Sequence, residues 1–294
     1  MMKVVVTIPA FNEEKTLPPV LEEIKNAMKH TKYNWQLQIV DDGSTDKTAE
    51  AAKKYDAVVV SHGRNKGLAE AFKTEVRNAI KLGADVIVHT DADGQYPAKH
   101  IPELLKKIEE GYDLVLGSRF AGKIEDMPFL KRRGNKAFSK VLSHFTKTKL
   151  TDVTTGFRAF TREVAEEVDI INSFTYTQEQ IIKASQKKFR IAEIPIYARK
   201  TRESRLFKSS WEYAWKAWLN IFRIYRDYQP LRFFGRIGTT MFLSGFVIGL
   251  YLLYEIWTTG GVGGIPRVIL SALLMLTGIQ IVLFGFLADM WKGR

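Results

Sequence analysis

Short apolar runs alternate along the N-terminal part of the chain with stretches whose apolar positions recur every three or four residues. The apolar runs predict strands at residues 4–8, 37–40, 57–60, 86–89 and 114–116. The periodic stretches predict helices at residues 14–28, 45–54, 68–82 and 101–110. Because strands and helices alternate, we expect an α/β fold with a mostly parallel sheet that helices cover.

Two long apolar stretches follow in the C-terminal part, at residues 237–257 and 268–288. The first contains one charged residue, Glu255, and the second contains none. Helices of this length rise about 31 Å, which matches the hydrocarbon thickness of a bilayer. The Gly-rich link between them is too short for a domain, so the pair predicts a transmembrane hairpin. A buried helical hairpin of a soluble protein is the alternative.

Aromatic residues recur among basic ones between the α/β part and these apolar stretches. They are Trp211, Trp215, Trp218, Phe222 and Tyr225. Their spacing of three and four residues predicts an amphipathic helix that lies at the membrane interface or packs on the α/β domain. We therefore expect three regions: an α/β catalytic domain at 1–207, interfacial helices at 208–234 and two transmembrane helices at 235–294.

The chain has 294 residues, no cysteine and a formal net charge of +12. Without cysteine, disulfides, thiolate metal sites and cysteine nucleophiles are excluded. The positive charge concentrates in the second half, which suits membrane lipids and phosphate groups as partners. Nucleic acid is not expected as a partner, because no recognisable binding motif accompanies the charge.

The distribution of charge around the apolar stretches predicts the membrane topology. Four arginines precede the first stretch, namely Arg223, Arg226, Arg232 and Arg236. Lys292 and Arg294 follow the second stretch. The positive-inside bias therefore places both ends of the hairpin in the cytoplasm. The first apolar run has no small-residue cleavage site after it and is not expected to be a signal peptide.

The strand predicted at 86–89 ends directly before two acidic residues, Asp91 and Asp93. Ligands of open α/β sheets bind at strand ends. Two carboxylates one residue apart at such an edge can share Mg²⁺ or Mn²⁺ and leave coordination positions for a diphosphate. A solvated turn is the alternative, because the pattern is common by chance. The position after a strand favours the metal site.

Two other predicted strands also end in polar residues. Asp42 can accept hydrogen bonds from a base or ribose, although its segment can equally serve to turn the chain and cap a helix. Phe11 can flank a base and Glu13 can bond to it, although their segment can equally begin a helix. The sequence has no G-x-G-x-x-G or Walker loop, so dinucleotide oxidoreductase and P-loop functions lose their main support.

In this order the three strand-end motifs resemble glycosyltransferase family 2, from about Val4 to Arg205. Further motifs resemble its dolichyl-phosphate mannose synthase branch and the related dolichyl-phosphate glucose enzymes. These motifs are Gly117-Ser118-Arg119, then Pro128 with Lys131, Arg132 and Asn135, then Asp152 to Arg158, and finally Arg199 to Arg205. The resemblance implies the Rossmann-like, nucleotide-sugar-binding A-type glycosyltransferase fold.

The resemblance also implies the site residues by position. Nucleoside contacts fall on Pro9, Phe11, Glu13, Val40 and Asp42. Metal and diphosphate contacts fall on Asp91, Asp93 and Gln95, with Ala92 beside the donor. Phosphate contacts fall on Arg119, Arg199 and Arg205, and acceptor-phosphate contacts fall on Lys131 and Asn135. Catalysis is then expected from Asp91, Asp93, Arg119, Lys131, Asn135 and Arg205.

Lys131 and Asn135 stand where the branch usually has Arg and Ser, and three further positions depart from its pattern. Arg202 stands where Gly is usual, Arg205 replaces a Lys, and Phe11 replaces a common Tyr. These changes bear on the choice of donor more than on the reaction.

The implied reaction moves a hexose from a nucleotide-diphosphate sugar to dolichyl or another polyprenyl phosphate and makes a lipid-linked sugar donor. GDP-mannose is the favoured donor and UDP-glucose the next, with UDP-N-acetylglucosamine also open. The acceptor phosphate is an anionic nucleophile at neutral pH, so transfer needs positioning and charge stabilisation rather than a base. We expect a single displacement with inversion.

Two alternatives remain at this point. A hydroxyl acceptor would need a carboxylate base such as Asp152 or Glu179. A membrane scaffold with a vestigial nucleotide-sugar site would need no chemistry at all. In either case the exposed faces of the two spans could join copies of the chain into a homo-oligomer.

Overall fold

The computed structural model of the protein describes residues 1–170, 176–200, 219, 222–223, 225–261 and 264–292. The chain divides into two compact units, Met1–Ala214 and Trp215–Arg294. The division lies within the segment predicted to hold the interfacial helices.

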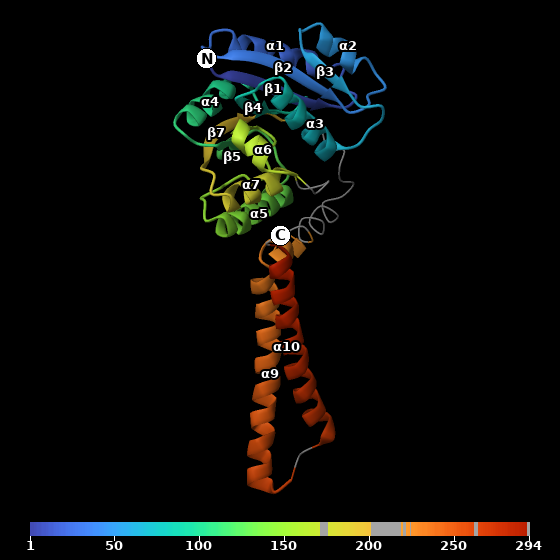
Figure 1. Ribbon diagram of the computed structural model, residues 1–294, viewed down its shortest axis with the longest axis vertical. Coiled ribbons are helices and arrows are strands. Elements are labelled where there is room, and N and C mark those ends of the chain that lie inside the picture. The colour runs from blue at the N-terminus through green and yellow to red at the C-terminus, as the bar shows by residue number, and fades with distance from the viewer. Residues whose placement is uncertain (171–175, 201–218, 220–221, 224, 262–263, 293–294) are drawn as a thin grey trace. The chain divides into compact units, whose positions relative to one another are not determined.

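The N-terminal unit is an α/β domain (Figure 1). Its described residues form one seven-stranded sheet in the order β3-β2-β1-β4-β6-β5-β7. The strands are β1 Lys3–Ala10, β2 Asn34–Asp41, β3 Val58–Ser61, β4 Val86–His89, β5 Leu114–Ile124, β6 Arg158–Thr161 and β7 Ile191–Ala198. The helices are α1 Leu17–Met28, α2 Thr48–Lys53, α3 Leu68–Lys81, α4 Ile101–Glu109, α5 Phe129–Thr146, α6 Arg162–Glu167 and α7 Tyr176–Gln186, with the short 3₁₀ helix η1 Ala98–His100 before α4.

Helices cover the sheet because its strands are apolar on both faces. On one face, Val4, Val6 and Ile8 of β1 belong to a buried core with the apolar sides of α1 and α4. On the other face lies α3, whose Glu75 carbonyl accepts a hydrogen bond from Gln38 of β2. The predicted α/β architecture is therefore confirmed.

The sheet is mostly parallel, as predicted, with one exception. β6 is antiparallel to both of its neighbours, β4 and β5. Its register pairs Arg158 with His89, the last residue of β4. The loop that leads into β6 therefore arrives at the end of β4, directly beside Asp91.

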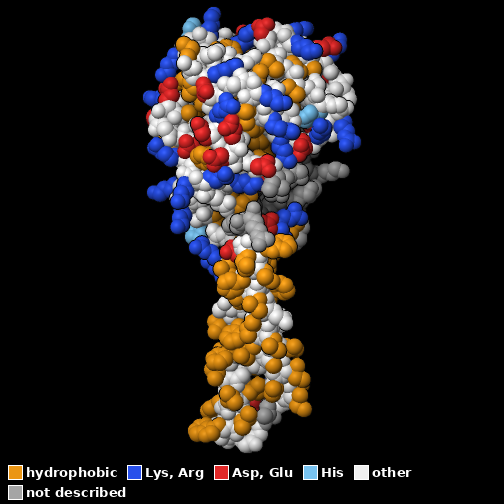
Figure 2. All heavy atoms as spheres, in the orientation of Figure 1, with side chains coloured by type: hydrophobic (Ala, Val, Ile, Leu, Met, Phe, Trp, Pro, Cys, Tyr) orange, Lys and Arg blue, Asp and Glu red, His pale blue; other side chains and the backbone are white. Residues whose placement is uncertain are grey.

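The C-terminal unit contains two long helices, α9 Pro230–Thr259 and α10 Ile265–Lys292 (Figure 1). Both are long and apolar enough to cross a membrane, and most of their side chains are exposed. Figure 2 shows that these exposed side chains are mainly hydrophobic. α9 and α10 are thus two candidate membrane spans and confirm the predicted hairpin.

Glycines allow α9 and α10 to pack closely. A Cβ atom on Gly238 would lie 2.5 Å from the carbonyl oxygen of Gly278, and one on Gly245 would lie 2.7 Å from that of Ser271. The Ser271 hydroxyl donates a hydrogen bond of 2.7 Å to the Gly245 carbonyl. Small residues and a polar bond at the contact are typical of helices that associate in membranes.

The predicted interfacial helix falls largely outside the described residues, which include neither Trp211, Trp215 nor Trp218. Phe222 and Tyr225 are described. Their rings lie edge-on to Phe233 of α9, with centroids 4.8 and 5.4 Å away.

Candidate functional site

The two predicted carboxylates lie at the carboxyl edge of the sheet, immediately after β4. Gly94 follows them with φ 73°, which glycine adopts without strain and which turns the chain sharply. Asp93 Oδ1 accepts a 3.0 Å hydrogen bond from the Gln95 backbone N–H. The segment is thus a tight turn that places both acids at the strand end, as the sequence predicts.

Asp91 lies in a half-buried position against the loop that leads into β6. Its Oδ1 is 3.9 Å from His89 Nε2, and Gly156 of the loop lies against its carboxylate. Burial raises the pKa of Asp91 to about 6, and the negative charge of Asp93 adds to this rise, while His89 and Arg119 oppose it. A carboxylate that is costly to ionise is one that a nearby cation would stabilise.

Arg119 of β5 is buried and held by the same loop. Its Nε donates to Asp152 Oδ2 at 2.6 Å, and its Nη2 donates to Asp152 Oδ1 at 3.0 Å and to Thr154 Oγ1 at 2.8 Å. Burial alone would lower the pKa of Arg119, but Tyr96 and Asp152 raise it on balance, so the guanidinium stays charged. None of these bonds uses Nη1.

Lys131 and Asn135 lie one turn apart on α5. Lys131 is half-buried, and burial together with the Arg119 charge lowers its pKa, while Asp93 opposes the change. Asn135 is buried. The structure therefore brings Lys131 into one electrostatic neighbourhood with Arg119, Asp91 and Asp93, four residues that the sequence analysis assigned to chemistry.

Behind Asp91 lies a buried polar network that sequence reasoning missed. His89 Nδ1 is 2.7 Å from Oε2 of Glu75 on α3, and His89 Nε2 is 3.3 Å from the Tyr176 hydroxyl. Glu75 and His89 are fully buried. Burial raises the pKa of Glu75, and His89 opposes the rise. The sequence contains one indication of this network: Glu75 falls on the apolar face of the helix predicted at 68–82.

Tyr96, which sequence reasoning missed, and Arg158, which ends the motif from Asp152 to Arg158, shape the loop between Asp152 and β6. Tyr96 stacks on Phe157 with ring centroids 5.5 Å apart, and burial raises its pKa to about 12. Arg158 is fully buried and donates to the Thr155 carbonyl and, at 2.9 Å, to Gln180 Oε1. These contacts fix the loop that carries Gly156.

The predicted nucleoside contacts lie at the ends of β1 and β2. Pro9 pairs with Val40 in the parallel register of these strands. Phe11 is partly exposed, and Glu13 is buried with its backbone N–H bonded to Thr48. These positions lie at the same carboxyl edge as Asp91, because β1 lies between β2 and β4.

Asp42, the fifth predicted nucleoside contact, is already bonded to the loop after β3. Its Oδ1 is 2.6 Å from His62 Nδ1 and accepts from the Lys66 backbone N–H, and its Oδ2 accepts from that of Gly67. Asp42 therefore holds the loop after β3 beside the predicted nucleoside contacts.

Two predicted phosphate contacts remain, Arg199 and Arg205. Of these, Arg199 forms an ion pair with a carboxylate of α1. Arg199 donates from Nη1 and Nη2 to the two carboxylate oxygens of Glu23 on α1, at 2.8 and 3.0 Å. Its backbone N–H donates to the Gln95 carbonyl, which ties β7 to the acidic turn. Arg205 lies outside the described residues.

The donor set at Asp91 and Asp93 fits a hard divalent cation, because carboxylate oxygens are the ligands that Mg²⁺ and Mn²⁺ prefer. Among the described residues, no group of three or more His, Cys, Asp or Glu side chains could hold an ion alone. A cation here would therefore take further oxygens from water or substrate.

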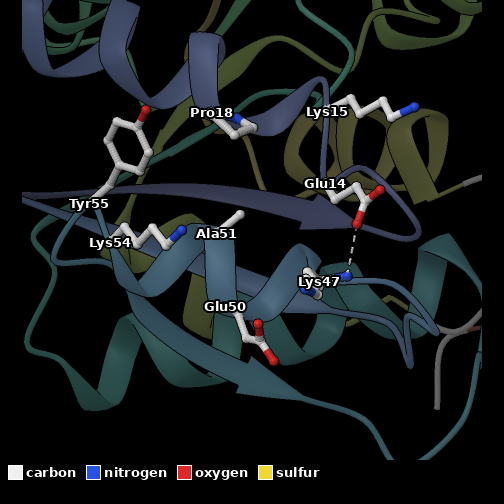
Figure 3. Close-up of a pocket in the computed structure, with 8 residues that line it drawn as sticks. All are labelled: Glu14, Lys15, Pro18, Lys47, Glu50, Ala51, Lys54 and Tyr55. Carbon is white, nitrogen blue, oxygen red and sulfur yellow. Dashed lines mark hydrogen bonds between the residues drawn. The ribbon is translucent and has the colours of Figure 1, made fainter.

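A cavity of about 430 Å³ lies between α1 and α2 (Figure 3). Glu14, Lys47 and Tyr55 are among its lining residues, and Glu14 accepts a hydrogen bond from the Lys47 backbone N–H. None of the predicted site residues that the structure describes lines it, so it is separate from the site at Asp91 and Asp93.

Two curated relatives are similar to this chain over about two thirds of its length. The dolichyl-phosphate hexose transferase of Haloferax volcanii is 33% identical over 68% of this chain and 85% of its own length. The dolichol-phosphate mannosyltransferase of Pyrococcus furiosus is 33% identical over 66% of this chain and 56% of its own length.

Comparison with a solved structure identifies the fold. Glucosyl-3-phosphoglycerate synthase of Mycobacterium tuberculosis, solved with Mn²⁺, UDP and glucosyl-3-phosphoglycerate, has a TM-score of 0.58 and 20% identity over 75% of this chain and 80% of its own. The fold is thus the A-type glycosyltransferase fold. Residues 5–169 match the family described as Glycosyl transferase family 2. With its acidic turn at the end of β4 and its basic residues on β5 and α5, the chain belongs to glycosyl transferase family 2.

Proposed function

We propose that the protein transfers a hexose from a nucleotide-diphosphate sugar to dolichyl or another polyprenyl phosphate, with inversion at the anomeric carbon. The observation that carries the proposal is that two acids at the end of β4 lie within electrostatic range of two cations: Arg119 of β5 acts on Asp91, and Asp93 acts on Lys131 of α5. The names of the two relatives support a lipid phosphate as acceptor. GDP-mannose is the favoured donor, and UDP-glucose is the next.

The acidic residues of the site would act on the donor through a metal ion, and the basic residues would act on the acceptor phosphate. A bound Mg²⁺ or Mn²⁺ would neutralise the leaving nucleotide diphosphate. Asp91 and Asp93 would hold that ion, with Gln95 beside them. Arg119, Lys131 and Asn135 would orient the incoming phosphate, whose negative charge these basic groups attract. Arg199 and Arg205 complete the proposed phosphate contacts.

The buried carboxylates support a phosphate acceptor over a hydroxyl. A hydroxyl acceptor needs a base with a free lone pair that faces the substrate. Asp152 is fully buried and accepts hydrogen bonds on both oxygens from Arg119. Glu179 is buried too, and its Oε1 is 2.9 Å from Lys183 Nζ. A phosphate needs no such base, since its attacking oxygen is already ionised.

The proposal includes a location. The catalytic unit and both ends of the hairpin would lie on the cytoplasmic side of the cell membrane, because Arg223 and Arg226 precede α9, Arg232 and Arg236 lie in its first two turns, and Lys292 ends α10.

A donor panel tests the proposal. The purified full-length protein would be incubated with dolichyl phosphate, Mn²⁺ and radiolabelled GDP-mannose, UDP-glucose or UDP-N-acetylglucosamine. We expect one donor to label the lipid, chelation to abolish labelling, and NMR of the product to show an inverted anomer. Asp91→Asn should be inactive, whereas Asp56→Asn, at a highly exposed carboxylate, should match the wild type. Undiminished transfer after chelation, or a retained anomer, contradicts the proposed mechanism.

A further inference from the structure

Two histidines connect helix α3 with the ends of two strands of the sheet. His62 follows β3 directly, and His89 is the last residue of β4. The side chain of His62 is 6% exposed, and that of His89 is fully buried. One ring nitrogen of each histidine lies within hydrogen-bond distance of a side chain of α3. Both rings are therefore held by the same helix.

The first connection leads to Asp42, a predicted nucleoside contact. His62 Nδ1 lies 2.6 Å from Asp42 Oδ1, and His62 Nε2 lies 2.9 Å from the Thr74 hydroxyl oxygen on α3. The Thr74 hydroxyl also donates to the Glu70 carbonyl at 3.0 Å, which fastens it to the helix backbone. Asp42 Oδ2 in turn accepts from the backbone N–H of Gly67, the residue before α3. The Asp42 carboxylate is thus held by α3 and by the loop that leads into it.

The second connection leads to Asp91, a predicted metal ligand. Glu75 Oε2 lies 2.7 Å from His89 Nδ1, and His89 Nε2 lies 3.9 Å from Asp91 Oδ1. The second distance is too long for a hydrogen bond, but it is short enough for His89 to limit where the Asp91 carboxylate can lie. Phe72, one turn before Glu75 on α3, contacts the same ring edge-on, with ring centres 5.2 Å apart. Helix α3 therefore sets the position of the imidazole beside Asp91.

Thr74 and Glu75, which make these two connections, are consecutive residues of one helix. Successive side chains of an α-helix point about 100° apart, so one can reach toward the end of β3 while the other reaches toward β4. The 14 residues of α3 share one ladder of backbone hydrogen bonds, so a shift of the helix moves both side chains together. The helix thus joins a predicted nucleoside contact to a predicted metal ligand.

Packing alone does not explain the buried glutamate of α3. The buried side chains of α1 and α4, on the other face of the sheet, are all apolar. Helix α3 instead buries Glu75 completely. A buried ion pair often stabilises a fold no better than apolar side chains of similar volume, because both of its partners lose their hydration. The position of Glu75 therefore indicates a role at the site rather than in stability.

We propose that Thr74 and Glu75 are positioning residues that couple nucleoside binding at Asp42 to metal binding at Asp91. This coupling rests on the function proposed above, which assigns both carboxylates to the donor. A cation at Asp91 would fix His89 against Glu75 and so fix the helix, and Thr74 would then hold Asp42 through His62. Each ligand would reduce the ordering that the other must impose, so each would strengthen the binding of the other by the same factor.

A nucleoside without phosphate tests the coupling, because it cannot contact the metal ion through a diphosphate. Guanosine and uridine would each be titrated into the full-length wild type in detergent, with and without Mg²⁺, and binding would be followed by NMR of the nucleoside. We expect Mg²⁺ to lower the Kd of the nucleoside that binds at least about fivefold. Equal Kd values with and without Mg²⁺, or no binding of either nucleoside, overturn the proposal.

Substitutions of Thr74 separate coupling from a purely structural role. Thr74→Val removes the hydroxyl with little change of shape, so the nucleoside Kd should no longer depend on Mg²⁺. Thr74→Ser keeps the hydroxyl and should keep the dependence. Thr31→Val is the matched control, since it removes a hydroxyl that donates to the Met28 carbonyl at the end of α1. A Thr74→Val protein that responds to Mg²⁺ as the wild type does overturns the proposal.

Glu75 offers a second test from the metal side. Glu75→Gln keeps an oxygen that can bond to His89 Nδ1, and Glu75→Leu removes it. We expect the effect of Mg²⁺ on nucleoside binding to persist in Glu75→Gln and to vanish in Glu75→Leu. A folded Glu75→Leu protein that keeps the full effect overturns the proposal. If Glu75→Leu does not fold, the comparison of Thr74→Val with Thr74→Ser decides.

The measurements also separate failure of the coupling from failure of the proposed function. If a donor labels the lipid but Mg²⁺ leaves nucleoside binding unchanged, the coupling fails and the proposed function stands. If Mg²⁺ strengthens nucleoside binding in the wild type and not in Thr74→Val, but no donor labels a polyprenyl phosphate, the proposed function fails and the coupling stands.

Discussion

The carboxylate of Asp91 lies against Gly156 so closely that a Cβ atom at residue 156 would be 2.9 Å from Oδ1 and 3.0 Å from Oδ2. The two residues are 65 positions apart and meet because antiparallel β6 lies beside β4. The glycine is therefore needed for space, and the position of a proposed metal ligand depends on it.

Gly156→Ala should displace the Asp91 carboxylate without unfolding the protein, because the added methyl meets the end of a side chain rather than backbone. We expect kcat/KM to fall about 10- to 100-fold, as misplaced reacting groups typically cause. Mn²⁺ affinity should fall as well, while the thermal unfolding temperature stays near that of the wild type. Gly63→Ala is the matched control, since nothing lies within 4 Å of a Cβ there. Full activity of Gly156→Ala would contradict the role of Asp91.

The first half of the fold follows from local patterns. The strand predicted at 86–89 has the bounds of β4, and the helix predicted at 101–110 differs from α4 by one residue. These elements are apolar or strongly periodic, so local sequence determines them. Because strand ends carry ligands in such sheets, the acidic turn could be located from sequence as well.

The second half was harder to predict. β6 has four residues and contains Arg158, whose buried side chain finds partners on α7 that no local pattern reveals. β7 contains a proline, and its pairing with β5 joins distant segments. The pair of Glu75 and His89 likewise depends on the order of the strands, which brings α3 over β4. Nonlocal pairing therefore explains most of what sequence reasoning missed.

The raised pKa of Asp91 predicts how metal binding depends on pH. Asp91 must be ionised to bind a divalent cation, and its pKa is raised to about 6. Below that pH a proton competes with the metal for the carboxylate. The apparent Kd for Mn²⁺ should therefore rise about tenfold for each further unit by which the pH falls. Because the metal in turn favours the ionised form, more Mn²⁺ should shift the acid limb of the activity profile to lower pH. Titration calorimetry and rate profiles at several Mn²⁺ concentrations measure this, and an acid limb that never moves argues against Asp91 as a ligand.

Asp152→Asn should destabilise the catalytic unit, because it leaves the buried Arg119 charge without its counter-ion. Loss of one partner of a buried ion pair typically costs about 3–5 kcal/mol of unfolding free energy. Asp126→Asn is the control, since its pair with Lys200 is exposed and should contribute less than about 1 kcal/mol. Denaturant unfolding of the full-length proteins in detergent measures both. Equal stability of the two variants would show that the Arg119 charge is compensated in another way.

Packing between the candidate spans depends on Gly238, since a side chain there would meet the Gly278 backbone at 2.5 Å. Backbone cannot move aside as a side chain can, so Gly238→Val should separate α9 from α10. Gly235→Val, three residues earlier, should not, because nothing lies within 4 Å of a Cβ at that position. Spin labels on cysteines at Val247 and Leu273, two exposed positions, would report the separation in nanodiscs. We expect a longer and broader distance distribution for Gly238→Val only, and an unchanged distribution would mean that other contacts hold the hairpin together.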